Sequence, residues 1–103
     1  MDKVQIEWGG MERSEAVEKD IFNKASKILS RAQMATHLIV NFKITNPISS
    51  AGPASQKVSM NLRLPHHQDI HAEREGDDLY KSIKETQQAL LTQIQAKKDQ
   101  NQI

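Results

Sequence analysis

The feature that most constrains the fold is one amphipathic segment, residues 14–31, which reads SEAVEKDIFNKASKILSR. Its apolar residues recur every three or four positions, so at about 100° per residue they share one side of a helix. Ser14 suits the N-cap, because its hydroxyl can accept a hydrogen bond from a free amide of the first turn. A second stripe, on one flank, is basic. The apolar positions are Val17, Ile21, Phe22, Ala25, Ile28 and Leu29, and the basic ones are Lys24, Lys27 and Arg31.

Four further segments alternate apolar and polar residues, which is typical of half-buried strands: 4–8, 37–44, 57–64 and 70–74. Residues 37–44 are nearly apolar on both sides, which favours a central strand. Pro65 and the polar residues after it predict a tight turn, and residues 70–74 an edge strand.

A second helix is predicted for residues 79–98, capped by Asp77 and Asp78. Thr86 and Gln87 fall where its apolar stripe should continue, so its middle is weakly apolar. We expect Tyr80 to anchor the start of this helix in the core.

The element order is therefore β-α-β-β-β-α. The first helix can make a right-handed crossover between two parallel strands, and the other strands can follow as an antiparallel meander. This predicts an α+β two-layer sandwich, with a four-stranded mixed sheet and both helices on one face. With 103 residues the chain suffices for one domain, expected over residues 1–98, with a frayed tail at 99–103.

Composition narrows the function. Without cysteine there can be no disulfide, thiolate zinc site or cysteine nucleophile. No apolar run approaches the roughly 18 residues of a membrane span, so no membrane partner is expected. No catalytic constellation or phosphate-binding loop is present, which predicts a protein that is not an enzyme. The net charge is only +1, so an anionic partner must meet a local basic patch.

Two segments carry a family resemblance: WGGMERSEAVEKDIFNKASKI at residues 8–28 and DIHAEREGDDLYKSIKETQQALLTQI at residues 69–94. With the element order, they resemble the ribosome hibernation-promoting factor and ribosome-associated inhibitor family, also known as sigma-54 modulation proteins. The second motif, I-H-A-x-x-E-G-x-D-(L/M)-Y-x-x-I, is the more specific. The chain resembles a short form that lacks the C-terminal dimerisation domain of long members.

The resemblance implies a cytoplasmic, non-catalytic stress-response protein without cofactor or small-molecule substrate. Family members bind the decoding region of the small ribosomal subunit, between head and body, block the tRNA and mRNA sites, and hold ribosomes in hibernation. Basic residues on both helices contact rRNA phosphates, so binding should depend strongly on salt. In the first helix, Lys24, Lys27 and Arg31 stand where the family has basic residues. In the last helix the charge comes from other positions, and the candidate rRNA-binding residues there are Lys81, Lys84, Lys97 and Lys98. Additional basic contacts would come from Lys57, Arg63, His66 and His67.

The chain also departs from the family pattern. Ala89, Thr92 and Ala96 stand where members often carry Lys or Arg, and the loop at 45–55 is uncharged where some relatives have His and Arg. An alternative function is therefore a protein-interaction or dimerisation module on the same scaffold, with weakened RNA binding. The oligomeric state is open, with a monomer as one option.

Single residues also carry alternatives. The basic stripe could be a solvated helix face in which Asp20 pairs with Lys24, and Trp8 could stack on a base but is better explained as a core residue capping the first strand. Three side chains share one strand parity and could ligate a metal, although no fourth ligand lies nearby, so no metal is expected. These are His67, Asp69 and His71.

Overall fold

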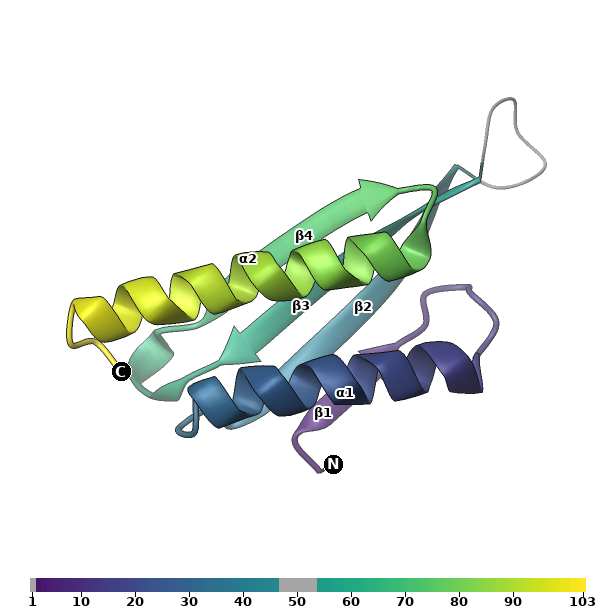
Figure 1. Ribbon diagram of the computed structural model, residues 1–103. Helices are drawn as coiled ribbons and strands as arrows, with labels where there is room; N and C mark the ends of the chain where they lie inside the picture. Colours follow the sequence, from purple (N-terminus) through teal and green to yellow (C-terminus); the bar gives the residue numbers. More distant parts are fainter. Residues whose placement is uncertain (1, 47–53) are drawn as a thin grey trace.

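The structure is a computed structural model that describes residues 2–46 and 54–103. The element order β-α-β-β-β-α is confirmed (Figure 1). The predicted loop at 45–55 has its central residues, 47–53, outside the described ranges. The elements are β1 (Val4–Glu7), α1 (Glu15–Arg31), β2 (His37–Asn46), β3 (Ser55–Arg63), a short 3-10 turn η1 (Pro65–His67), β4 (Ile70–Gly76) and α2 (Leu79–Asp99).

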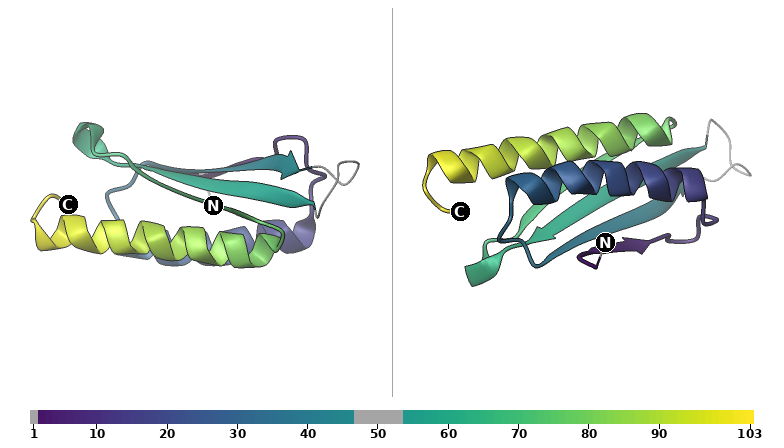
Figure 2. Two further views of the ribbon diagram at one scale, coloured as in Figure 1. Left: turned by 90° about the horizontal axis from the view of Figure 1, so that it is seen from above. Right: turned by 60° about the horizontal axis from the view of Figure 1, so that its bottom comes forward.

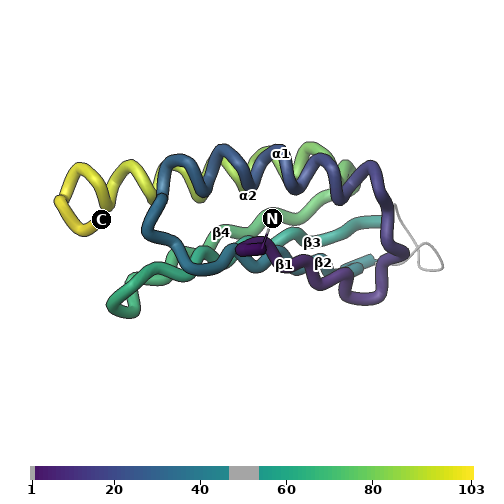
Figure 3. The backbone as a smooth tube through the Cα atoms, turned by 90° about the horizontal axis from the view of Figure 1, so that it is seen from below, coloured from purple at the N-terminus to yellow at the C-terminus, as the bar shows by residue number. Residues whose placement is uncertain are grey.

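The sheet has the strand order β1-β2-β3-β4, with β1 parallel to β2 and the other pairs antiparallel. β2 is an internal strand and β4 an edge strand, as predicted. Both helices cover the same face, which confirms the two-layer α+β sandwich (Figure 2). β1 and β4 run in the same direction, and each is followed by a helix that runs back across the sheet. α1 and α2 are therefore parallel, and their C-terminal ends lie at the same end of the molecule (Figure 3).

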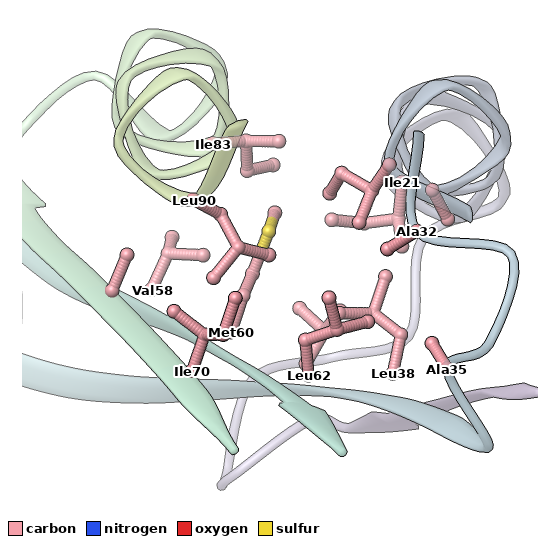
Figure 4. Close-up of a cluster of buried hydrophobic side chains, with 14 of the residues drawn as sticks. Ile21, Ala32, Ala35, Leu38, Val58, Met60, Leu62, Ile70, Ile83 and Leu90 are labelled. Carbon is pink, nitrogen blue, oxygen red and sulfur yellow. The ribbon is translucent and has the colours of Figure 1, made fainter. Parts of the chain in front are cut away.

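The core lies between the sheet and the two helices. Alternate residues of each strand point into it, while Ile21 and Ile28 of α1 and Ile83 and Leu90 of α2 close it from above. The side chain of Met60 rises from β3 towards the space between the helices (Figure 4). The buried strand residues are Leu38, Val40, Phe42, Val58, Met60, Leu62, Ile70 and Ala72.

Both helices begin where the sequence predicts. The backbone amide of Val17 donates to Oγ of Ser14 at 3.3 Å, and that of Lys81 donates to Oδ1 of Asp78 at 3.2 Å. Each cap satisfies an amide that has no partner within its helix, which fixes the first turn.

The polar residues in the middle of α2, Thr86 and Gln87, are buried, and one of them connects α2 to α1. Thr86 is fully buried, and its hydroxyl donates to the Ser82 carbonyl at 2.7 Å. The side-chain amide of Gln87 donates to the Lys24 carbonyl of α1 at 3.4 Å. One of the polar residues that interrupt the apolar stripe of α2 therefore forms a hydrogen bond to α1.

Tyr80 does not anchor α2 in the core: 48% of it is exposed, so that prediction is wrong. Leu79 and Ile83 take the inward positions of the first turn, and Tyr80 lies about 100° around the helix from Leu79.

The tail also differs from the frayed end that we expected. The amide of Gln102 donates to the Lys97 carbonyl at 2.8 Å, and Asn101 turns the chain with a φ of 59°. The tail bends back because this turn lets the apolar side chain of Ile103 pack, partly buried, against the core.

Trp8 packs against the core, as expected, and is partly buried. Its ring stacks on that of Phe42 with centroids 5.3 Å apart, at the end of the sheet where β1 stops. Gly9 follows with a φ of 59°, and a Cβ built there would overlap the Phe42 carbonyl oxygen. Only glycine fits this close approach of two backbones.

Candidate nucleic-acid interface

The basic stripe of α1 lies on the flank that faces α2. Glu18 and Phe22 occupy the opposite flank, where they line a hollow together with residues of β1. Lys24 bonds through its carbonyl to Gln87 of α2, while Lys27 and Arg31 are exposed further along. Since Lys24, Lys27 and Arg31 lie roughly 90° around the helix from its buried centre, they lie along the line where α1 meets α2.

α2 also carries cations on the flank that faces α1. Gln87 marks the flank that faces α1, and on the opposite flank Gln93 donates its amide to the His71 carbonyl of β4 at 2.7 Å. Lys98, eleven positions after Gln87, lies about 20° from it around the helix, and Lys84, three positions before it, lies about 60° from it on the side away from the core. Both are exposed.

We call the surface bordered by Lys24, Lys27, Arg31, Lys84 and Lys98 the helix groove. Its two sides meet at the C-terminal ends of the helices, where Arg31 and Lys98 line one hollow of about 300 Å³. Lys84 and Lys98 are fourteen positions apart, so the groove follows about 21 Å of α2. The two helices run side by side, so segments from the two ends of the sequence are neighbours (Figure 1).

One cation of the groove is already engaged. The Lys24 ammonium lies 2.9 Å from Oδ1 of Asp20, one turn earlier, and both side chains are largely buried. The alternative reading of an Asp20–Lys24 pair is therefore confirmed for this residue. Among the described residues, Lys27 and Arg31 form no such ion pair, so of the three stripe cations these two are free to meet an anion.

Two of the seven helix residues suggested by the resemblance lie away from the groove. Lys81 projects about 60° beyond Lys84, towards the outer side of α2. Lys97 lies on the flank that faces away from α1, and its ammonium contacts Oε1 of Gln102 at 3.4 Å. The neutral residues lie on the outer and β4-facing sides of α2, so their lack of charge does not reduce the number of cations in the helix groove. These residues are Ala89, Thr92 and Ala96.

The additional basic candidates are also elsewhere. Lys57 and Arg63 lie on the uncovered face of the sheet, because they alternate along β3 with Val58, Met60 and Leu62, which point into the core. Nζ of Lys57 is 2.8 Å from Oε2 of Glu73, and the Arg63 guanidinium is 3.9 Å from the Asp69 carboxylate. The structure thus pairs these two cations with acids.

The Lys57–Glu73 pair predicts how the Glu73 carboxyl titrates. The hydrogen bond from Lys57 lowers the pKa of the Glu73 carboxyl below its usual value and raises that of Lys57. The stabilisation from Glu73 is therefore present at neutral pH and disappears as the pH falls through the lowered pKa. We expect NMR titration to show Glu73 titrating at lower pH than an ordinary glutamate. The variant Lys57→Gln should raise this pKa towards the usual value, while the neighbouring His71 still lowers it. An unchanged Glu73 titration in Lys57→Gln would contradict the pair.

The histidines form no metal centre in the described part of the chain. There, no three His, Asp or Glu side chains are arranged to hold a metal ion. His66 and His67 adopt positive φ angles of 62° and 58° in η1, exposed. Nδ1 of His71 lies 2.7 Å from Oδ1 of Asn61, and Asp69 accepts from the Leu64 amide at 3.2 Å. The polar side chains of this end therefore shape the turn.

The sequence alone did not identify the hollow at the helix ends. Besides Arg31 and Lys98, it is lined by Ser30, Ala32, Gln33, Met34, Leu64 and Ile103. Two features of the sequence could have predicted this hollow. Both predicted helices have basic residues in their last turn, and the predicted topology makes the two helices parallel.

Comparisons with known proteins agree with this architecture. The sequence pattern of the family described as "Sigma 54 modulation protein / S30EA ribosomal protein" matches residues 4–102. No curated protein is similar enough in sequence to match. Neither helix in the described ranges is both long and apolar enough to span a membrane.

Two solved structures are similar. One is a ribosomal subunit interface protein from Coxiella burnetii, 25% identical, with a TM-score of 0.78 over 93% of this chain and 97% of that one. The other is the N-terminal domain of Thermus thermophilus Protein Y, 19% identical, with a TM-score of 0.64 over 87% of this chain and 91% of that one, which supports the fold alone. The pattern match covers nearly the whole chain, and therefore the chain belongs to the sigma-54 modulation protein / S30EA ribosomal protein family.

Proposed function

We propose that this protein is a ribosome-associated hibernation factor of the cytoplasm, without catalytic activity. It binds small-subunit rRNA in the decoding region through the helix groove and blocks the sites of tRNA and mRNA. The family description names a ribosomal protein, and the similar Coxiella burnetii structure is of a ribosomal subunit interface protein.

The observation that carries the proposal is the convergence of cations from both helices. Lys27 and Arg31 come from α1, and Lys84 and Lys98 from α2, yet all border one groove. A row of exposed cations about 21 Å long can follow a phosphate backbone. Such binding reads position and shape rather than sequence, which suits structured rRNA.

Sedimentation of the purified protein with small ribosomal subunits over a salt series tests this proposal. With three to five phosphates neutralised, the logarithm of the affinity should fall against the logarithm of the salt concentration with a slope of about −2 to −4. Absence of binding at every salt concentration would overturn the proposal.

A competition experiment tests the position on the subunit. If the protein occupies the decoding region, saturating mRNA and tRNA should displace it from small subunits at constant salt. Binding that is indifferent to both ligands would place the protein elsewhere on the subunit.

A second candidate function, the protein-interaction or dimerisation module, is supported by the free edge at β1. Beside it lies a hollow of about 400 Å³ whose walls include Val4, Ile6, Trp8 and Phe22. An unpaired strand edge next to apolar side chains can accept a further strand. Light scattering after gel filtration tests self-association: a concentration-dependent dimer would favour this candidate, and a monomer at high concentration would exclude dimerisation.

A further inference from the structure

The hollow at the C-terminal ends of the two helices, which we call the terminal pocket, has walls of two kinds. Arg31 and Lys98 supply positive charge from different helices, and Ser30 and Gln33 supply polar groups. Met34, Leu64 and Ile103 supply apolar surface. Its volume of about 300 Å³ is at the lower end of the roughly 300–1,000 Å³ typical of ligand pockets.

Met34 is the unusual member of this set. It is 61% exposed, the highest value among the large hydrophobic residues of the described ranges. It lies in the connector between α1 and β2 and lines the same hollow as two cations. A thioether makes favourable contacts with aromatic rings, and a guanidinium plane can stack on a nucleobase. The apolar and basic groups of the pocket therefore suit a flat ring attached to an anion.

The pocket is also the end of the helix groove, because Arg31 and Lys98 belong to both. An RNA strand whose phosphates follow the groove would arrive at the pocket with its next nucleotide. The last carbonyls of α1 and the Gln33 amide can accept and donate hydrogen bonds at a base edge. Unstacked bases are the usual sites of recognition in RNA, since helical RNA hides its base edges.

We propose that the terminal pocket holds one unstacked nucleotide of the bound RNA, an inference that rests on the proposed function. The base contacts Met34, and Lys98 contacts the adjoining phosphate. Met34 is therefore a binding residue of the interface that contributes contact without charge.

Salt dependence separates the two contributions. We expect Met34→Ser to lower the affinity for small subunits about two- to tenfold without changing the salt slope, since a thioether contact is lost and no charge is removed. Lys98→Gln should reduce the salt slope by about 1. Ile44→Ser is the matched control, because Ile44 is another exposed apolar side chain of the described ranges, 39% exposed, on β2 away from the pocket. It should bind like the wild type.

The outcomes separate the pocket from the groove. If the wild type sediments with subunits and Met34→Ser binds equally well, the pocket assignment is overturned while the proposed function stands. If Met34→Ser and Ile44→Ser lose affinity equally, the loss is not specific to the pocket, and the assignment is overturned as well. Unchanged melting temperatures of both variants establish that folding is intact.

A second measurement works without ribosomes. The Met34 methyl resonance should shift through the ring current of a base when a single-stranded tetraribonucleotide is added, and less with adenosine 5′-monophosphate. Equal shifts with both probes would make this a site for free nucleotides and overturn the assignment to an RNA strand. No shift with either probe would overturn the pocket itself, whether or not the subunits bind.

Discussion

The variant Gly9→Ala is expected to lose about 3 kcal/mol of unfolding free energy, the sum of a strained backbone and a steric overlap. Gly9 has a φ of 59°, which side chains with a Cβ rarely adopt, and the added methyl would overlap the Phe42 carbonyl oxygen. Relief requires β2 to move away from the turn after β1, which would also separate Trp8 from Phe42. Urea unfolding followed by tryptophan fluorescence measures the loss.

The neighbouring glycine provides a matched control. Gly10 also has a positive φ, 91°, but a Cβ built there meets no atom within 4 Å. Gly10→Ala should therefore lose only the conformational part, about 1 kcal/mol. Equal losses in the two variants would show that the close approach to Phe42 contributes nothing.

The second large effect is on RNA binding. The double variant Lys27→Glu/Arg31→Glu should bind small ribosomal subunits at least about 100-fold more weakly at low salt, because two attractions to phosphate become repulsions. Both side chains are exposed, so the fold should remain intact. Lys24 is left unchanged, since reversing its charge would place a second carboxylate beside the largely buried Asp20.

The control must carry the same change in net charge. Lys3→Glu/Lys43→Glu does so with two exposed lysines that follow the outward parity of β1 and β2, on the face opposite the helices. We expect its affinity to stay within about threefold of the wild type, because the groove is untouched. If both doubles lost affinity equally, binding would depend on net charge rather than on the groove, and if neither did, the groove would not be the RNA site.

Much of the fold was predictable because its determinants are local. Strand alternation gave the inward residues of β2 and β3, and the Ser14 and Asp78 caps gave the starts of both helices. The prediction for Tyr80 was wrong because neighbouring residues of a helix point about 100° apart. Leu79 packs against the core, so the side chain of Tyr80 is directed towards the solvent. The tail was misassigned because the packing of Ile103 depends on a turn at Asn101 that no periodicity indicates.

The candidate site was predictable only in part, for a physical reason. Sequence periodicity places Lys27 and Arg31 on a flank of α1, but it does not say which neighbour that flank meets. The hydrogen bond from Gln87 to Lys24 decides this, and it joins residues far apart in the chain. The same geometry separates Lys84, which faces the groove, from Lys81, which does not.

The groove exists only when both ends of the chain are in place, since one side comes from the first helix and the other from the last. An unfolded chain therefore cannot offer the same arrangement of cations. A ligand that binds only the native state adds to stability by mass action, by about 2.7 kcal/mol at a hundred times its dissociation constant. Bound protein should thus resist proteolysis better than free protein.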